Sequence, residues 1–405
     1  MAESTGDAGA GSGRAIRKGD LVVGRPVPYS IYDTYDRLLI RRGYVLRSES
    51  QRQLLLEVGR TDPKETPAEP TSPPAQEERH RPGGRSESRF VEPPNPFDVY
   101  RHCAQALRQA FRQIDHDPAG FRSRLERLIA RLGNLIDHDA DATLGAAHLE
   151  AELSTPITHP IRTAIVCDVA ARRIGLSGPR RRGLVGAALT ANVGMLELQA
   201  ALDQQAEPLT AEQRAQVERH PADSGTILER NGITDESWLQ AVYQHHERVD
   251  GSGYPHGLTG EQICDEAAVL MIADSYLAMV GVRAHREARD LRSALSELFQ
   301  SEGRLYPAEH ANALIKEMGV FPPGTPVTLS NGEHAVVTRR GPTTTQPQVC
   351  VYATAPGRHR SRPRHRDLSE EAVQITSVHA ITEARLPFSA EIVWGYGQDS
   401  GSLVF

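Results

Sequence analysis

The sequence predicts a multidomain, mainly α-helical protein, in which an all-helical domain is flanked by a small N-terminal α/β unit and a C-terminal β-rich module. Two observations carry this prediction. From Phe97 to about Met318, apolar residues recur at three- and four-residue steps, which is the spacing of a helix with one buried face. After Phe321-Pro322-Pro323-Gly324, short alternating apolar runs between Gly, Pro and Asn residues predict strands joined by turns.

Length and composition narrow the class of protein. A chain of 405 residues, 39% hydrophobic and 24% charged, is typical of a globular protein of two or three domains. The net charge of -6 gives no overall attraction to nucleic acid or membrane. No run approaches the roughly 18 apolar residues of a membrane span, and the N-terminus lacks the pattern of a secretory signal. Four scattered cysteines form no CxxC pair, so we expect a cytoplasmic protein without a disulfide framework.

Changes in composition divide the chain. The first residues are Gly, Ala and Ser with little to bury, and a later stretch rich in Pro, Glu, Arg and Ser cannot form a core. The predicted divisions are a disordered tail at 1–13, the N-terminal α/β unit at 14–60, a Pro-rich linker at 61–96, a helical connector at 97–138, a helical domain at 139–320 and the β-rich module at 321–405.

Individual elements follow from local patterns. In the N-terminal unit we expect strands at 21–23 and 38–40 and a helix at 49–58. Thr210 and Gln213 predict a helix-capping box, and Gly232 predicts the end of that helix. The predicted helices of the central domain include 161–174, 184–189, 238–246 and 267–280, and the predicted strands of the last module are 327–329, 335–337, 348–352 and 373–375.

One carboxylate and several histidines stand out in the helical domain. Asp274 lies in a helix that is apolar on nearly every side, where an unpaired carboxylate would cost several kcal/mol. It must therefore be neutralised, bound to hydrogen-bond donors or bound to a cation. His159, His220, His245 and His246 each lie at or near the end of a predicted helix, and Pro221 is expected to break the helix that holds His220. Together they fit a histidine/carboxylate site for Mn, Fe, Ni or Zn.

The stretch His245-His246-Glu247-Arg248-Val249-Asp250-Gly251-Ser252-Gly253-Tyr254-Pro255 joins paired histidines to a stiff glycine-rich turn. With the following Gly257-Leu258-Thr259-Gly260-Glu261-Gln262-Ile263, it resembles the signature of HD-GYP domains, a subclass of the HD metal-dependent phosphohydrolase superfamily. The resemblance spans about residues 140–320. It implies an all-helical domain that binds two or three metal ions and hydrolyses cyclic di-GMP, a bacterial signalling molecule.

The resemblance also implies roles for individual residues. His159, His220, His245, His246 and Asp274 match the metal ligands, and Arg283 and Arg286 match basic residues that face the substrate phosphates. In the family, the loop that follows the paired histidines is linked to contacts with diguanylate cyclase (GGDEF) domains. We expect the exposed tyrosine on it to be a recognition element, within the loop residues Asp250, Gly251, Gly253, Tyr254 and Pro255.

The chain departs from the family where the namesake His-Asp dyad belongs. The segment reads Leu189-Thr190-Ala191-Asn192-Val193-Gly194-Met195, so Ala191 replaces the histidine, Asn192 the metal-bridging aspartate and Met195 a lysine. A neutral amide leaves two adjacent dications to repel with little compensation. We expect no intact catalytic dyad, at most a single Mn, Fe, Ni or Zn ion or none, and an impaired two-metal reaction. Whether Glu247 or a spare histidine fills the gap is left open.

Other charged motifs have simpler interpretations. Asp115-His116-Asp117 and Asp137-His138-Asp139 contain His-Asp dipeptides beside helix ends, and are interpreted as caps and surface charge. Arg180-Arg181-Arg182 is expected in a turn between helices. Five alternating arginines favour a solvated or protein-contacting loop, because no aromatic residue lies between them for base stacking: Arg358, Arg360, Arg362, Arg364 and Arg366.

The function predicted from the sequence is that of an HD-GYP-type protein of bacterial cyclic-di-GMP signalling, catalytically impaired and acting by ligand or partner binding. The first alternative is a metal-dependent cyclic-di-GMP phosphodiesterase with a reduced metal site. The second is a scaffold that binds a GGDEF-domain protein through the loop with Tyr254. Cyclic di-GMP, a GGDEF protein and a second copy of the chain, as a homodimer, are the candidate partners, with no nucleic acid and no membrane insertion.

Overall fold

The computed structural model describes residues 94–150, 155–281, 288–355, 358–383 and 386–396, together with 14–17, 19–23, 25–32, 38–40, 42, 52, 55, 56, 60 and 61. The chain forms two compact units, Met1–Arg89 and Phe90–Phe405. The tail expected at 1–13 and most of the linker expected at 61–96 lie outside the described residues.

In the N-terminal unit, four short strands pair antiparallel in the order β1-β4-β2-β3. The predicted strand at 38–40 coincides with β3, but the one predicted at 21–23 is wrong. Turns bracket that run, since the backbone N–H groups of Asp20 and Arg25 bond three residues back, and Leu21 alone is buried while Val22 is 44% exposed. The helix expected at 49–58 falls largely outside the described residues. The strands are β1 (Arg14–Ala15), β2 (Ile31–Tyr32), β3 (Leu38–Ile40) and β4 (Arg60–Thr61).

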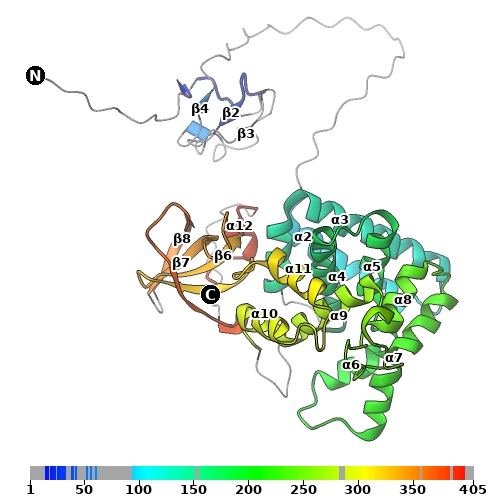
Figure 1. Cartoon of the computed structure of the whole chain (residues 1–405). Coiled ribbons are helices and arrows are strands. Elements are labelled where there is room, and N and C mark those ends of the chain that lie inside the picture. Colours follow the sequence, from blue (N-terminus) through cyan, green and yellow to red (C-terminus); the bar gives the residue numbers. More distant parts are fainter. Residues whose placement is uncertain are drawn as a thin grey trace, which may run out of the picture. The chain divides into compact units, whose positions relative to one another are not determined.

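The second unit is mainly helical from Pro96 to Met318, as predicted (Figure 1). In Figure 1 the helices α6, α7 and α8 lie at one end of this unit, and the C-terminal sheet lies at the other, beside α10 and α12. The helices are α2 (Pro96–Arg112), α3 (Pro118–Leu149), α4 (Thr155–Arg173), α5 (Gly178–Thr190), η1 (Val193–Met195), α6 (Leu196–Leu202), α7 (Ala211–Arg230), α8 (Glu236–Gln244), η2 (Gly260–Gln262), α9 (Asp265–Val280), α10 (Leu291–Gln300) and α11 (Ala308–Met318).

Helices α4, α5 and α9 supply the centre of the core, and the run predicted to be buried at 184–189 is buried in α5. Close packing explains Gly186 of α5, because a Cβ atom there would lie 2.5 Å from the Trp238 ring. The segment Gly178–Leu202 reaches the length and mean hydropathy, 1.2, of a membrane span, contrary to the expectation from sequence. However, 61% of the most apolar window of this segment is buried inside the fold. The segment is also not one helix, because it comprises α5, η1 and α6.

The arginines expected in a turn before α5 lie instead in its first turn. Arg180 binds Asp265 and Glu266, at the start of α9, with the Nε to Glu266 Oε1 distance at 2.6 Å. Arg181 binds Asp168 of α4, which is almost completely buried. The turn assignment failed because Arg180 and Arg181 find carboxylate partners on neighbouring helices, so they join α5 to α9 and α4 although Arg180 stays largely exposed.

The predicted C-terminal module is a five-stranded antiparallel sheet of order β8-β7-β6-β5-β9, followed by the short helix α12 (Ala390–Trp394). The strands predicted at 327–329, 335–337 and 348–352 are confirmed, and the fourth begins two residues later than expected. The loop expected at the alternating arginines is wrong, because they form the edge strand β8. Their period of two is that of a strand, which the absence of apolar residues concealed. The strands are β5 (Pro326–Leu329), β6 (His334–Arg339), β7 (Gln348–Ala355), β8 (Arg358–Asp367) and β9 (Ile375–Val378).

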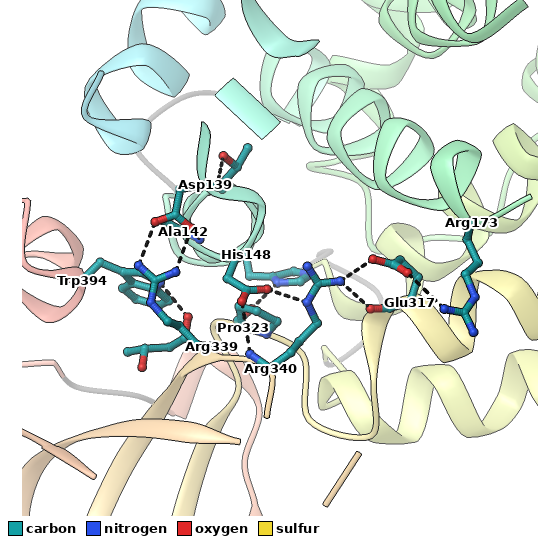
Figure 2. A network of polar contacts seen from close by, with 12 residues as sticks. Asp139, Ala142, His148, Arg173, Glu317, Pro323, Arg339, Arg340 and Trp394 are labelled. Atoms are coloured by element: carbon teal, nitrogen blue, oxygen red, sulfur yellow. Dashed lines mark hydrogen bonds and ion pairs between the residues drawn. The ribbon is translucent and has the colours of Figure 1, made fainter. Parts of the chain in front are cut away.

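A polar network attaches this sheet to α3 (Figure 2). Arg339, at the end of β6, donates two hydrogen bonds to Asp139, at 3.1 and 2.8 Å. Arg340 reaches Asp141 and Glu317, and Tyr396 donates to Asp139 at 2.7 Å. Asp139 does cap a helical turn, since it accepts from the N–H of Ala142 at a kink in α3, but its side chain is only 8% exposed. The interpretation of Asp139 as surface charge is therefore wrong, because an arginine 200 residues later buries it.

A second contact between α3 and the C-terminal part of the unit is made by His148. Its Nδ1 lies 2.7 Å from the carbonyl oxygen of Pro323, and its Nε2 lies 3.2 Å from the hydroxyl of Tyr276 in α9. Since a carbonyl only accepts, Nδ1 carries the proton and Nε2 accepts from Tyr276. Gly324 passes close to this ring, where a Cβ atom would lie 2.8 Å from the Cβ of His148. Both ring nitrogens of the neutral His148 therefore have a hydrogen-bond partner.

Candidate metal and ligand site

The structure brings together the histidines and the aspartate that the sequence singled out. The ligand nitrogens of His220, His245 and His246 all lie within 4.8 Å of one another. His159, in the first turn of α4, places its Nε2 2.7 Å from Oδ1 of Asp274 in α9. His159, His246 and Asp274 line one cavity of about 600 Å³. Helices α4, α7, α8 and α9 thus each contribute to one site.

His220 occupies the middle of α7, which runs from Ala211 to Arg230 through Pro221. The prediction that Pro221 breaks this helix is wrong. Proline has no N–H to bond the carbonyl four residues before it, so the Val217 oxygen is free. That oxygen lies 2.6 Å from Nδ1 of His220, which replaces the missing donor. The His-Pro pair therefore fixes the ring of His220 without ending the helix.

The same arrangement recurs at the end of α8. His245 is the C-cap residue, and its Nδ1 lies 2.6 Å from the carbonyl oxygen of Val242, which the end of the helix leaves free. Because both carbonyls only accept, both Nδ1 atoms carry the proton. The Nε2 atoms of His220 and His245 are then two acceptors that face each other at 3.1 Å. Burial lowers the pKa of both rings, that of His220 to about 3, so neither is readily protonated to relieve the contact.

This pair of facing acceptors fits a bound cation. Metal-binding histidines typically donate their second ring N–H to a carbonyl, as these two do. Two nitrogens at about 2.1 Å from one ion and at roughly right angles lie about 3 Å apart, which matches the observed separation. Half-buried His246 completes the cluster with its ring centroid 4.1 Å from that of His245. The residues present therefore fit a divalent metal ion.

Asp274 supplies the negative charge of the site. Its side chain is 17% exposed and lines the cavity. Burial by itself would raise the pKa of Asp274, but the hydrogen bond and charge of His159, with the nearby His246 and His245, lower it below its usual range. The carboxylate is thus ionised and paired, as expected for a buried aspartate, and a cation at the histidines would face it.

The side chains at the two predicted dyad positions, Ala191 and Asn192, lie in different surroundings. Ala191 is buried at the end of α5 and is absent from the cavity lining, whereas Asn192 and Met195 line the cavity beside the histidines. Segment η1 is held against α7, since the N–H of Gly194 donates to Ser224 Oγ at 2.9 Å. Asn192 is 7% exposed, and its Oδ1 has no hydrogen-bond partner in the described part of the chain. The Asn192 side chain thus lines the cavity without bringing a charge to it.

Glu247 does not supply a carboxylate at the predicted dyad positions. It is fully buried, and its two carboxylate oxygens accept from the N–H groups of His256 and Leu258 at 2.8 and 2.9 Å. It thereby holds the glycine-rich loop against the end of α8. Gly253 permits the closeness, because a Cβ atom there would lie 2.4 Å from the N of Arg248.

The tyrosine of this loop faces inward. Tyr254 is half-buried, lines the cavity, and stacks on His246 with ring centroids 4.8 Å apart. Burial raises the pKa of Tyr254, and the charge of Asp274 adds to this effect. The expectation of an exposed recognition tyrosine is not met, because the loop turns the ring of Tyr254 onto His246. Asp250 is exposed and binds Ser252 within the loop.

Among the cavity residues that sequence reasoning missed are Gln199 and Asp203, from α6 and its C-cap, and Arg248. Arg248 stands inside the quoted motif, so it could have been found, and its guanidinium lies 5.2 Å from the centre of the Tyr306 ring. Nothing in the sequence marks Gln199 and Asp203 beyond their four-residue spacing. The predicted phosphate-facing residues Arg283 and Arg286 lie outside the described residues, so their role stays a prediction.

Comparison with known proteins identifies the domain. Residues 145–309 match the model of a family described as HD domain. The chain is 28% identical, over 56% of its length and 60% of the relative's, to the cyclic di-GMP phosphodiesterase response regulator RpfG of Xanthomonas campestris. It is 26% identical to a cyclic di-GMP phosphodiesterase of Pseudomonas aeruginosa, over 56% and 58% of the two chains. It is 28% identical to the 3'3'-cGAMP-specific phosphodiesterase 3 of Vibrio cholerae, over 49% and 40%.

Among solved structures, an HDG"Y"P protein of Bdellovibrio bacteriovorus is matched over 74% of this chain and 97% of that chain, at 14% identity and a TM-score of 0.46. By the family match, residues 145–309 form an HD domain. The relatives named above are phosphodiesterases of cyclic dinucleotides, in agreement with the resemblance carried by the motif from His245 to Pro255. The chain spans about 60% of the length of the first two relatives.

Proposed function

We propose that this protein binds a divalent metal ion and a cyclic dinucleotide of bacterial signalling, and that it hydrolyses the nucleotide slowly or not at all. The observation that supports binding is the pair of acceptor nitrogens of His220 and His245, 3.1 Å apart with no donor between them. The observation that supports impaired catalysis is the neutral Asn192 amide at the cavity wall, where the family carries a bridging carboxylate.

The ligand set explains why one ion is favoured over two. Three neutral imidazoles and one carboxylate, Asp274, which His159 already pairs, give the ligand set a charge no more negative than about −1, so it offsets at most half of one dication. A second dication beside the first would be repelled, and the neutral Asn192 amide supplies no charge to offset that repulsion. A bound ion would act as a Lewis acid toward a phosphate oxygen. His159 keeps Asp274 oriented, Arg248 offers its guanidinium to a phosphate, and Tyr254 shields the histidines.

The substitution Asn192→Asp tests this proposal. Wild-type protein reconstituted with Mn²⁺ or Fe²⁺ should contain about one metal ion per chain and linearise cyclic di-GMP barely above background. Asn192→Asp should bind more metal and raise turnover roughly tenfold or more, because the new carboxylate supplies charge between two ions. Metal analysis and chromatography of the nucleotide products measure both.

Asn192→Ala is the matched control, since it removes the amide without adding charge, and it should leave turnover at background. The alternative, a working phosphodiesterase with a reduced site, is favoured by the intact cluster of three histidines. Two metal ions in the wild-type protein, with turnover that His245→Ala abolishes, would establish that alternative and overturn the impaired form. The scaffold alternative has less support, because Tyr254 packs on His246 rather than facing a partner.

A further inference from the structure

The edge strand β8 carries a concentration of positive charge that the metal site does not use. Its residues, Arg358–Asp367, include five arginines and two histidines but only one carboxylate. Within the described chain β8 pairs with β7 on one side and with no strand on the other. No residue of β8 lines the cavity of the histidines, and the sheet lies at the end of the unit opposite α6, α7 and α8 (Figure 1). A role for this charge is therefore separate from the metal site.

The chain pairs the last arginine of β8 with carboxylates and leaves others without an ion pair. Arg366 binds Glu333 at 2.8 Å and also binds Glu371, and its side chain is only 10% exposed. Three arginines form no ion pair within the described residues, and they are exposed or half-buried: Arg358, Arg360 and Arg364. Like charges gathered in one strand repel one another, so carboxylates supplied from outside would relieve that repulsion.

A bulge interrupts the pairing of β8 with β7. Residues 360–363 of β8 stand opposite the single residue Tyr352 of β7. The pairs on either side of the bulge are Val351 with Arg364 and Ala353 with His359. Pro363, inside the bulge, has no N–H to donate. A bulge and a proline are devices that keep a sheet edge from pairing with another strand, so protection of the edge does not by itself account for the arginines. A partner would be held by guanidinium groups rather than by backbone pairing.

The chemistry of this surface favours an acidic polypeptide over other anions. Guanidinium groups bind carboxylates through two parallel hydrogen bonds, and arginine is enriched at protein interfaces. Nucleic acid is less well served, because β8 contains no aromatic residue for base stacking and Tyr352 is only 7% exposed. An anionic membrane is less well served, because β8 has no large apolar side chain to insert. The β8 strand of a second copy would place like charges opposite one another.

We propose that β8 is a docking surface for an acidic, extended segment of a partner protein, bound through Arg358, Arg360 and Arg364. The inference goes beyond the proposed function and does not depend on it, because the surface lies apart from the metal cavity. The probe is a fluorescently labelled peptide in which glutamate and serine alternate, titrated with the full chain while anisotropy is measured. The wild-type chain should bind this peptide, and rising NaCl should weaken the binding because exposed charges are screened.

The triple variant Arg358→Gln/Arg360→Gln/Arg364→Gln should bind the peptide roughly tenfold more weakly, the loss expected for three exposed ion pairs. The matched control is the triple variant Arg108→Gln/Arg127→Gln/Arg131→Gln, which removes the same charge from exposed positions on α2 and α3. This control should bind the peptide as tightly as wild type does. Circular dichroism melting confirms that both variants are folded.

Two results would overturn the docking surface: no binding of the peptide by the wild-type chain, or an equal loss of binding in both triple variants. Single-stranded DNA and vesicles that contain phosphatidylserine are titrated in parallel. Binding of either one more tightly than the peptide, lost in the β8 variant, would assign these arginines to another class of partner and overturn the acidic polypeptide. Cyclic dinucleotide binding should be the same in all three proteins, so failure of this inference leaves the proposed function standing.

Discussion

Two polar networks lie within the Phe90–Phe405 unit, and they differ in how many of their polar atoms have hydrogen-bond partners within the described chain. Between α3 and the sheet, Asp139 accepts from Arg339, Ala142 and Tyr396, and His148 is bonded on both ring nitrogens. Around the histidines, several atoms face one another or the cavity without a donor or acceptor to match. The first network stabilises the fold by itself, whereas the second is complete only with a ligand. Both are dense in charge, so the count of charges alone does not separate a structural network from a functional one.

The largest effect is expected in the satisfied network, at His148. Burial lowers the pKa of His148 to about 4, from an ordinary value of 6.5. The folded protein keeps the ring neutral, while the unfolded chain takes up a proton, so the stabilisation is complete above pH 6.5 and is lost as the pH falls toward about 4. Over this window wild type should lose about 3 kcal/mol more of its unfolding free energy than His148→Gln, whose amide keeps a donor and an acceptor. Urea unfolding at a series of pH values measures the difference.

His138→Gln, at an exposed position ten residues earlier, should leave the pH dependence of wild type unchanged. Parallel curves for wild type and His148→Gln would show that the ring is not held neutral by its two partners.

The next largest effect is expected at Asp139. Asp139→Asn leaves Arg339 and Tyr396 facing a neutral amide, and it should lower the unfolding free energy by about 2 kcal/mol. The estimate is below that for a fully buried pair, because the Arg339 side chain is 42% exposed. The control is Asp137→Asn, two residues before Asp139, which removes an exposed ion pair with Arg172. It should lower the unfolding free energy by at most about 0.5 kcal/mol. Equal losses at both positions in thermal unfolding would contradict the distinction between them.

The smallest effect on stability, but a larger one on metal binding, is expected at Gly253. A Cβ atom there would meet backbone atoms of Glu247 and Arg248, so the loop must shift and carry Tyr254 away from His246. Gly253→Ala should cost about 1 kcal/mol in stability and weaken Mn²⁺ binding several-fold. Gly232→Ala, where φ is +78° and no atom lies within 4 Å, should cost a similar free energy of unfolding without changing metal affinity. Isothermal titration with Mn²⁺ separates the two variants, and equal metal affinity would remove the loop from the site.

The sequence was most informative where local rules and long-range packing agree. The capping box of Thr210 and Gln213 and the buried helix α9 follow from patterns that the fold preserves. It misled at Pro221, where the neighbouring His220 replaces the lost donor and the helix continues. It also misled at Asp139, which is buried because Arg339 reaches it across 200 positions, a partner that no local pattern contains.

The sequence by itself indicated the HD domain, through the motif from His245 to Pro255, and raised the hypothesis that the dyad is lost, from Ala191 and Asn192. It also determined most helices and strands of the Phe90–Phe405 unit, because hydrophobic period and turn chemistry are local properties of the chain. Only the tertiary structure decided which polar atoms lie together: that the Nε2 atoms of His220 and His245 face each other, and that Tyr254 turns inward onto His246. These contacts depend on groups that different elements bring together, and in this protein the unsatisfied nitrogens mark the site.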